Sequence, residues 1–226
     1  MPAKRPDPAG ADGPLEAALR AFAQAMDGTR APWAIIGGLA VIVHGVRRLT
    51  TDVDAVVAGD RMSAAQALRA LASRDVVPRI DDAEAFAQAH LVLLLRHRPS
   101  GVDIDLSFGW TEFERIALAK RDVAAFGKVE APFVRPVDLV VYKGLAGRAK
   151  DLEDLAALLL LHRELDLVEA RGRLAELAAV AEAPEILEGF DATVALVHPQ
   201  GPGTEARRDS PSPKDAAKKR AKKSRR

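Results

Sequence analysis

Cysteine is absent from the 226 residues, and only 4% of them are aromatic. Disulfides and thiolate metal sites are thereby excluded, and a reducing compartment is the natural setting. The longest apolar runs, such as Leu155–Leu161, are far shorter than the roughly twenty residues of a membrane span. The first residues are not followed by an apolar stretch, unlike a secretory signal. We therefore expect a cytoplasmic protein with no membrane partner.

Charge is unevenly distributed along the chain, although the formal net charge is only +1. Residues 201–226 contain ten Lys or Arg and three Asp or Glu, a net charge of +7. The remaining 23 basic and 29 acidic residues give the rest of the chain a net charge of −6. A tail rich in Lys, Ala, Ser and Pro cannot bury enough apolar surface to fold alone. It is suited to bind RNA phosphates, but a merely solubilising role fits it equally well.

The sequence divides into four segments. Residues 1–12 are rich in Pro, Gly and Asp and are expected to be loose, and residues 199–226 form the disordered basic tail. Between them, residues 13–135 alternate helical and strand patterns, whereas residues 136–198 have helical patterns only. The prediction is an α/β (α+β) core followed by a C-terminal helical subdomain.

Apolar periodicity and turn residues predict the elements of the core. Helices are expected over residues 14–26, 38–45, 63–73, 81–89 and 111–120, and strands over residues 33–36, 52–57, 76–80, 91–97, 102–108, 123–126 and 129–134. Residues 98–101 have the composition of a hairpin turn. Ser63 is a candidate helix cap, and Thr111 with Glu114 a candidate capping box. Further helices are expected over residues 137–146, 151–162, 167–181 and 185–195.

Two carboxylates, Asp52 and Asp54, are one residue apart on a predicted strand. Residues at this spacing project from the same face, with Cα atoms roughly 6–7 Å apart. Arg48 and Thr50 share that parity, and if the strand begins near Thr50, Asp52 and Asp54 can both reach a pair of metal ions about 3.5–4 Å apart. Two aspartates on an apolar strand repel each other, and a hard divalent cation such as Mg²⁺ or Mn²⁺ resolves this repulsion. The simpler alternative is that both face solvent on an edge strand.

A later predicted strand contains two more acids, Asp103 and Asp105, which also share a face. Either could supply a third carboxylate to the same cation. Before the first aspartate pair, Gly37 and Gly38 follow a short buried strand and open a helix. Two glycines allow a phosphate to approach the backbone. Neither the Walker A motif nor the dinucleotide fingerprint is present.

The Gly37-Gly38 pair, thirteen further residues, Asp52-x-Asp54 and a later strand carboxylate together resemble the minimal nucleotidyltransferase superfamily. This superfamily shares its fold with the head of DNA polymerase beta. The resemblance implies a mixed sheet flanked by helices, with the active cleft above the acidic strands. It also implies transfer of a nucleoside monophosphate from a nucleoside triphosphate to an acceptor hydroxyl.

Within the superfamily, the run from Arg48 to Asp54 resembles the AbiEii-like branch, found as toxins of bacterial toxin–antitoxin pairs. The resemblance continues through residues 105–114 and 143–154 and covers roughly residues 30–165. By this analogy Asp52 and Asp54 bind the metal ions, and Asp105 helps hold the catalytic metal and deprotonates or orients the acceptor. The pattern that follows Asp105 favours it over Asp103.

Basic residues at the start of the helical part are the candidate triphosphate contacts, namely Lys143, Arg148 and Lys150. The resemblance implies functional roles for Lys143 and Asp154. Simple surface charge explains the lysines equally well, and a local ion pair explains Asp154. Arg48 is expected to pair with an active-site carboxylate or a phosphate.

Two residues outside these motifs are considered for a role in the site. His44 follows the glycines and is expected to be a packed, hydrogen-bonded residue and not a catalyst. Trp110 is expected in the core or at a rim, with a place near the base pocket as an alternative.

The leading hypothesis is a metal-dependent nucleotidyltransferase, acting as a toxin on tRNA or another RNA and paired with a cognate antitoxin. A protein or a small-molecule acceptor would use the same catalytic face. The rival hypothesis is an inactive transferase that serves as a binding or regulatory module. All of the carboxylate positions are filled, which argues against loss of activity.

Overall fold

A seven-stranded mixed sheet is the central element of this computed structural model, which describes residues 13–199. Its strands are β1 (Trp33–Ile36), β2 (Asp52–Ala58), β3 (Val76–Pro78), β4 (Val92–His97), β5 (Val102–Gly109), β6 (Asp122–Phe126) and β7 (Val129–Phe133). Their order is β3-β4-β5-β2-β1-β7-β6. β2 and β5 are parallel neighbours, as are β1 and β7, and the other pairs are antiparallel.

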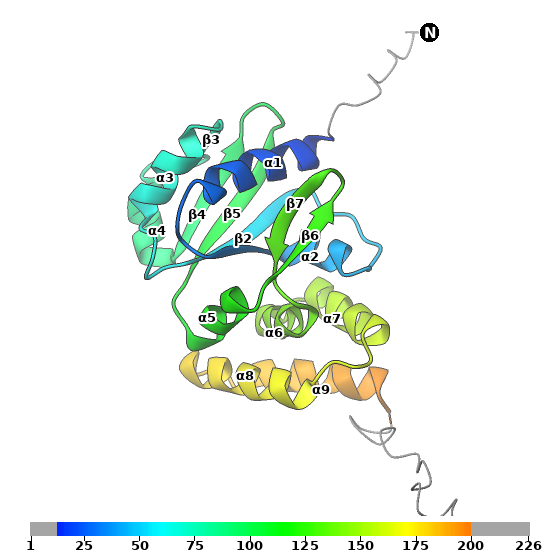
Figure 1. Cartoon of the computed structure of the whole chain (residues 1–226). Helices are drawn as coiled ribbons and strands as arrows, with labels where there is room; N and C mark the ends of the chain where they lie inside the picture. Colours follow the sequence, from blue (N-terminus) through cyan, green and yellow to red (C-terminus); the bar gives the residue numbers. More distant parts are fainter. Residues whose placement is uncertain (1–12, 200–226) are drawn as a thin grey trace, which may run out of the picture.

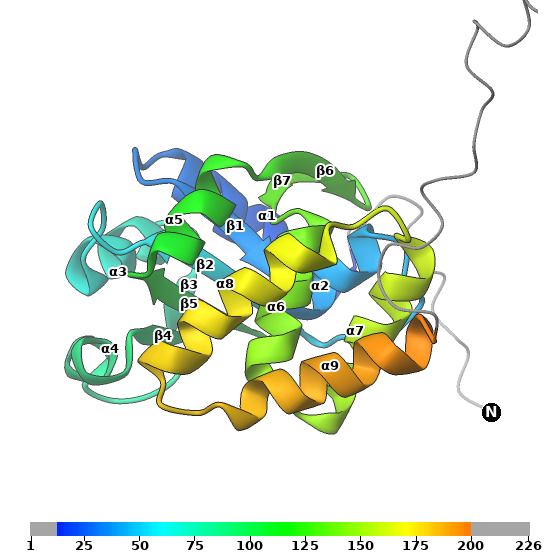
Figure 2. The ribbon, with the colours of Figure 1, turned by 90° about the horizontal axis from the view of Figure 1, so that it is seen from below.

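The helices form separate layers around this sheet (Figure 1). Those of the first part are α1 (Pro14–Asp27), α2 (Gly37–Val43), α3 (Ala64–Ala72), α4 (Ala83–His90) and α5 (Glu112–Ala119). Those of the second part are α6 (Pro136–Ala146), α7 (Ala149–Leu161), α8 (Leu167–Val180) and α9 (Glu185–Val197). Helices α6 and α7 lie next to the sheet, and α8 and α9 cover them from outside (Figures 1 and 2). The predicted α/β class with a C-terminal helical segment is confirmed.

Local signals in the sequence account for several element boundaries. Ser63 caps α3 through a reciprocal capping box with Gln66, and Thr111 does the same for α5 with Glu114. Residues 98–101 connect β4 and β5 as an antiparallel hairpin, with His97 opposite Val102. These predicted features are confirmed because each depends on residues close together in the chain.

Other boundaries differ from the predictions. The first helical residue of α4 is Ala83, so Asp81 and Asp82 precede it, and Asp82 has a left-handed backbone with a φ of 50°. β2 begins at Asp52, so Thr50 precedes the strand. The division into a core of residues 13–135 and a helical part of residues 136–198 stays a prediction. Residues 1–12 and 200–226, including almost the whole predicted tail, lie outside the described residues.

Strand alternation gives the sheet one apolar face. Val53, Ala55 and Val57 of β2 are fully buried, and α1 contacts the sheet through Phe22, whose ring meets Trp33 edge-on at 5.4 Å. Residues of the other parity on β2 and β5 include the aspartates. Burial of the apolar face therefore fixes the register and forces the acids onto the opposite face.

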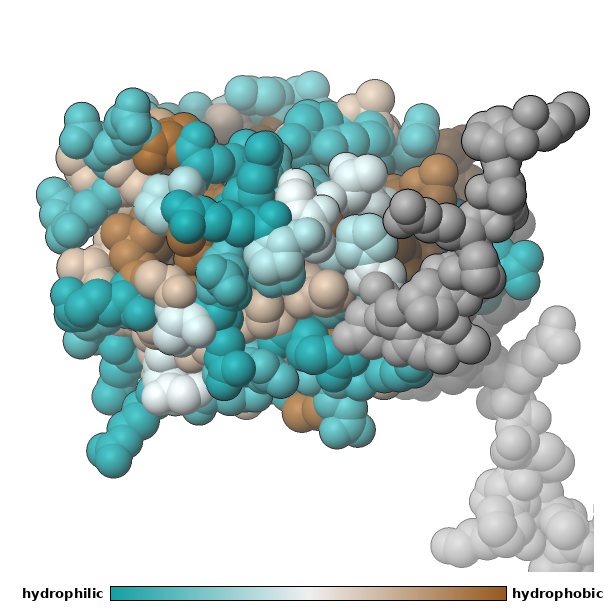
Figure 3. Space-filling view, turned by 90° about the horizontal axis from the view of Figure 1, so that it is seen from above, coloured by the Kyte–Doolittle hydropathy of each residue, from teal (hydrophilic) through white to brown (hydrophobic). Residues whose placement is uncertain are grey.

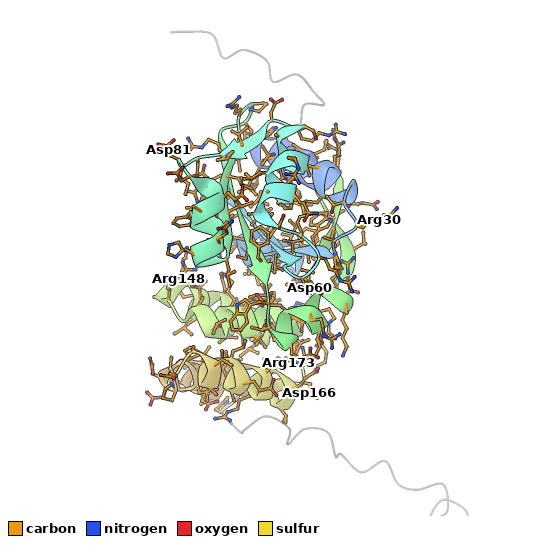
Figure 4. All side chains as sticks on the ribbon, turned by 90° about the vertical axis from the view of Figure 1, so that its left-hand side faces the viewer. Arg30, Asp60, Asp81, Arg148, Asp166 and Arg173 are labelled. Carbon is orange, nitrogen blue, oxygen red and sulfur yellow. The ribbon has the colours of Figure 1, made fainter. Side chains whose placement is uncertain are left out.

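The helical part is held by close packing and by a buried ion pair. Gly144 of α6 permits this approach, since a Cβ there would lie 2.9 Å from Leu174 and 3.1 Å from Phe190. Asp138 is completely buried and accepts hydrogen bonds from Arg135 and Arg173. Figure 4 shows Arg173 between α6 and α8. These contacts join α6, α8 and α9 into one packed unit.

The end of the molecule opposite α8 and α9 is largely hydrophilic, with apolar residues only in small patches (Figure 3). Within residues 13–199, every helix is too short or too polar to cross a bilayer.

Candidate active site

Four aspartates form two rows across the parallel pair β2 and β5. Asp52 is opposite Asp103, and Asp54 is opposite Asp105. All four share the strand parity that the apolar core does not occupy. The fold thus brings the two predicted metal-binding acids beside both candidates for the third carboxylate.

Asp54 is the carboxylate whose environment most disfavours its charge. Burial raises its pKa above the ordinary value, and repulsion by Asp52 and Asp105 adds to the increase. A hydrogen bond from the Gly38 backbone acts in the opposite direction but does not cancel it. Lys143 also favours the charged form, but burial and the neighbouring carboxylates outweigh it, and a bound cation would relieve this cost.

The aspartates of β5 and those of β2 differ in their cationic partners. Arg79 donates to Asp105 at 2.5 Å, and Arg96 donates to Asp103 at 2.6 Å. Within residues 13–199, Asp52 and Asp54 have no Lys or Arg nitrogen at ion-pair distance. The uncompensated negative charge is therefore concentrated on the aspartates of β2.

Two glycines at the start of α2 face these residues. A Cβ on Gly38 would lie 2.4 Å from Oγ1 of Thr50, and Thr50 itself donates to Asp52 at 2.8 Å. A Cβ on Gly37 would collide with the Asp54 carboxylate. The glycines are therefore required so that the backbone can lie directly against the acidic strand.

A cavity of about 180 Å³ lies beside the glycines and β2. Its lining residues are Ile36, Gly37, Gly38, Arg48, Thr50, Asp52, Asp54, Tyr142, Lys143, Ala146, Arg148, Lys150 and Asp151. A second, open hollow of about 330 Å³ is lined by Thr51, Asp52, Arg79, Gly101, Asp103 and Asp105. Asp52 borders both. The predicted nucleotide-binding residues thus share the first space, whereas the third-acid candidates line the second.

An ion network around the buried Lys143, Asp151 and Asp154 closes the helical side of the cavity. Lys143 lies 3.0 Å from Asp151 and 2.8 Å from Asp154. Arg148 donates to Asp151, and Arg48 donates to Asp154. Three cations and two carboxylates leave one positive charge in excess beside the cavity. In Figure 4, Arg148 lies where the helical layer meets the sheet.

The geometry corrects several sequence interpretations. Arg48 and Thr50 are not on the strand with Asp52, because β2 begins only there, and Arg48 reaches Asp154 on α7 instead. Lys143 is only 6% exposed, so the surface-charge interpretation is wrong for it. Lys150 is exposed at the cavity rim and forms no ion pair with any other residue of 13–199.

Two residues outside the motifs, His44 and Trp110, lie in different environments. His44 packs against His162, and its Nε2 lies 2.7 Å from the Val134 carbonyl oxygen, as expected for a structural histidine. Trp110 is 65% exposed at the far end of β5 from the acids and does not line the cavity beside the glycines, so its place near a base pocket stays a prediction. Trp33, by contrast, is buried in the core.

Sequence reasoning missed Arg79 and Arg96. Arg96 could have been found, because the hairpin turn at residues 98–101 fixes His97 opposite Val102 and hence Arg96 opposite Asp103. Arg79 could not, since it reaches Asp105 only through the pairing of β3 with β4. No local pattern indicates that pairing.

Asp52 and Asp54 fit a divalent cation, whereas Asp105 as it stands does not complete the set. Oxygen ligands suit Mg²⁺ and Mn²⁺, and burial together with repulsion by Asp52 and Asp105 raises the pKa of Asp54. Among residues 13–199, no three acidic or histidine side chains are grouped so as to share a metal ion. The Asp105 carboxylate is engaged by Arg79.

The family model of a nucleotidyltransferase of unknown function (DUF6036) matches residues 16–183. The chain belongs to this family and is therefore a nucleotidyltransferase, an enzyme class that binds nucleotides and transfers a nucleoside monophosphate. The resemblance to the nucleotidyltransferase superfamily is thus confirmed. The AbiEii-like branch stays a prediction. A search of curated proteins found no match.

Three solved structures are similar in fold. An antigenic nucleotidyltransferase-like protein from Paracoccidioides brasiliensis is 17% identical, with a TM-score of 0.47 over 78% of this chain and 92% of that one. The antibiotic-resistance factor ANT(2'')-Ia in solution is 14% identical, with a TM-score of 0.42 over 80% and 91% of the two chains. ANT(2'')-Ia in complex with adenylyl-2''-tobramycin is 14% identical, with a TM-score of 0.38 over 79% and 95%.

Proposed function

We propose that this nucleotidyltransferase is a Mg²⁺- or Mn²⁺-dependent enzyme that transfers a nucleoside monophosphate from a triphosphate to a hydroxyl of RNA. The observation that carries the proposal is the pair Asp52 and Asp54. Both lack a cationic partner among the described residues, and both line the cavity that the two glycines border. No structural role in the sheet requires such a pair there.

The cavity residues divide into acids and cations that suit the two parts of a metal-bound triphosphate. Asp52 and Asp54 would hold the cation, which neutralises charge on the triphosphate and on the leaving pyrophosphate. The network of Lys143, Arg148 and Arg48 has one excess positive charge and lies beside the same cavity. We assign the phosphates to this side, with Lys150 at the rim and Thr50 orienting Asp52.

In the proposed reaction, the acceptor hydroxyl oxygen bonds to the α-phosphorus as the bond from that phosphorus to the pyrophosphate oxygen breaks. The hydroxyl proton passes to a nearby carboxylate. Asp105 is our candidate because it lines the open hollow next to Asp52, where an acceptor has access. Asp103 is less suitable since two arginines lie within 4 Å of it. Such transfer depends on positioning and on charge neutralisation more than on covalent help.

An RNA acceptor is favoured by charge. The tail of residues 201–226 has a net charge of +7, whereas the remainder of the chain is acidic. A polyanion would be attracted to the tail and could place its end at the hollow. The resemblance to the AbiEii-like branch further favours a toxin that an antitoxin partner neutralises, in the cytoplasm.

The test is nucleotide incorporation. The purified chain is incubated with each labelled nucleoside triphosphate, Mg²⁺ and total RNA, beside Asp52→Asn and Asp54→Asn variants. We expect label in RNA with at least one nucleotide, and a loss of roughly 10²-fold or more in either variant. Asp191→Asn, an exposed change on α9, is the matched control and should retain activity.

Other outcomes identify the alternatives. Label in protein or in an added aminoglycoside, with none in RNA, would show that RNA is not the acceptor. The proposed transfer of a nucleoside monophosphate would still stand. Absence of incorporation into any acceptor would favour the inactive binding module. For the toxin role, induced expression of the wild-type chain in bacteria should arrest growth, whereas the Asp54→Asn variant should not.

A further inference from the structure

Two rows of side chains cross the sheet on the acidic face. In one row, Arg96 of β4 is opposite Asp103 of β5, which is opposite Asp52 of β2. In the next row, Leu94 of β4 is opposite Asp105, which is opposite Asp54. Leu94 offers no polar group, so a cation for Asp105 must come from beyond β4.

Arg79 supplies that cation from the edge of the sheet. Its backbone nitrogen donates to the Leu94 carbonyl oxygen at 3.0 Å, which anchors it next to this row. From there its guanidinium reaches past Leu94 and donates to Oδ1 of Asp105 at 2.5 Å. Asp105 is therefore neutralised by a residue that comes after β3, far from the other site residues in the sequence.

A second carboxylate lies within reach of the same guanidinium. Nη1 of Arg79 is 3.6 Å from Asp103, and the side chain of Arg79 is 28% exposed. Arg79 could thus leave Asp105 and remain paired with Asp103 in the adjacent row. Arg79 thus has two alternative partners, Asp103 and Asp105, of which only Asp105 is a candidate catalytic residue.

We propose that Arg79 is a positioning residue that masks Asp105 in the resting enzyme, so that Asp105 joins Asp52 and Asp54 only when Arg79 releases it. The proposal rests on the proposed function and deepens it. It explains why the acids of β2 lack cations while Asp105 has one. It also makes the third carboxylate a regulated member of the site, since transfer of the nucleoside monophosphate to water in place of the acceptor would be suppressed while the mask is in place.

The test is the affinity of the full chain for Mn²⁺, measured without nucleotide by the electron paramagnetic resonance signal of free Mn²⁺. Replacing Arg79→Gln should strengthen Mn²⁺ binding by about fivefold or more, within the range of typical coupling between sites. The matched control is Arg96→Gln, which removes the same charge but acts on Asp103. We expect less than half of the Arg79 effect from it.

A double-variant cycle identifies the route of the effect. In an Asp105→Asn background, Arg79→Gln should no longer change Mn²⁺ affinity, because the masked group is gone. If the effect persists there, or if Arg96→Gln matches Arg79→Gln, the mask is refuted and only general electrostatics remain. Arg79→Lys keeps the charge but loses the planar fork, and it should give an intermediate affinity even if the glutamine variant fails to fold.

Failure of this inference is distinguishable from failure of the proposed function. If the wild-type chain binds Mn²⁺ and Asp54→Asn abolishes binding while Arg79→Gln has no effect, only the mask is overturned. If neither the wild-type chain nor the Arg79→Gln variant binds Mn²⁺, the metal site and the mask both fall.

Discussion

Gly37 and Asp54 lie so close together that no side chain fits between them. A Cβ at Gly37 would be 1.9 Å from Oδ2 of Asp54. Gly37 also has a φ of +62°, in the left-handed region that residues with a Cβ rarely adopt. The position of the Asp54 carboxylate therefore depends on a residue without a Cβ at position 37.

Replacing Gly37→Ala should damage both stability and nucleotide binding. The left-handed backbone alone costs about 1–2 kcal/mol for an alanine, and the collision with Asp54 displaces the carboxylate as well. Urea unfolding and equilibrium binding of a nucleoside triphosphate with Mg²⁺ measure the two effects. Gly172→Ala is the control, because a Cβ there meets nothing within 4 Å on helix α8. It should stabilise the chain by about 0.5–1 kcal/mol.

Asp54→Asn should raise the stability of the metal-free protein while it removes activity. Folding raises the pKa of Asp54 through burial and through repulsion by Asp52 and Asp105. The folded state therefore binds the proton more tightly than the unfolded state, so this residue makes stability fall as pH rises from the ordinary pKa to the raised one. Asparagine cannot ionise and escapes that penalty.

The measurement is Tm against pH with EDTA for the wild-type chain and the Asp54→Asn variant. The advantage of the variant should be absent well below pH 3.8, grow as pH rises through the window and stay constant above it. Added Mg²⁺ should raise the Tm of the wild-type chain only. Asp191→Asn should behave oppositely, since Arg171 lowers the pKa of Asp191. A Tm difference that is independent of pH would contradict this account of Asp54.

Local sequence patterns were sufficient to predict the strand face on which the aspartates lie. They were not sufficient to predict which arginines and lysines surround them. The alternation of Val53, Ala55 and Val57 with the acids predicts one buried and one acidic face, because strand period is a local property. The hairpin at residues 98–101 likewise predicts how β4 meets β5. Strand alternation and hairpin register depend only on residues close together in the chain, so they can be predicted without knowledge of the tertiary structure.

The cationic surroundings depend on tertiary structure, which one sequence does not reveal. Arg48 meets Asp154 across 106 residues, and that contact requires α7 to pack beside the loop before β2. Arg48 and Thr50 precede β2 and yet line the same cavity as Asp52 and Asp54, so the sequence predicted their shared side but not the loop that provides it. Lys143 was open to interpretation as surface charge because α6 is apolar on most sides and its burial depends on α7 and α8.

Asp154→Asn tests whether the network is structural as well as electrostatic. Asp154 is 6% exposed and accepts from Arg48 while it lies 2.8 Å from Lys143. Its neutralisation leaves Arg48 without an ion-pair partner and the buried Lys143 with Asp151 alone, a change that costs up to about 3–5 kcal/mol. Urea unfolding should show this loss. Asp191→Asn breaks an exposed pair with Arg171 and should cost about 0–1 kcal/mol. Equal losses would show that Asp154 contributes no more than a surface ion pair.

Arg148→Ala separates phosphate binding from stability. Arg148 lines the cavity, and its side chain is 65% exposed although it donates to the buried Asp151. Asp151 keeps Lys143 as a partner when Arg148 is removed, so Tm should change little. The KM for the nucleoside triphosphate should rise roughly tenfold, the worth of one charge-assisted hydrogen bond, with a smaller change in kcat.

The control for Arg148 is Arg163→Ala, which removes an equal charge from an exposed position just after α7, outside the residues that line the cavity. It should leave KM unchanged at 0.15 M salt, because charges farther apart than about 8 Å are largely screened in solvent. Equal increases in KM for both variants would mean that the triphosphate responds only to overall charge. A large loss of kcat with an unchanged KM for Arg148→Ala would instead place this guanidinium at the transition state, because only interactions stronger there than in the ground state accelerate transfer.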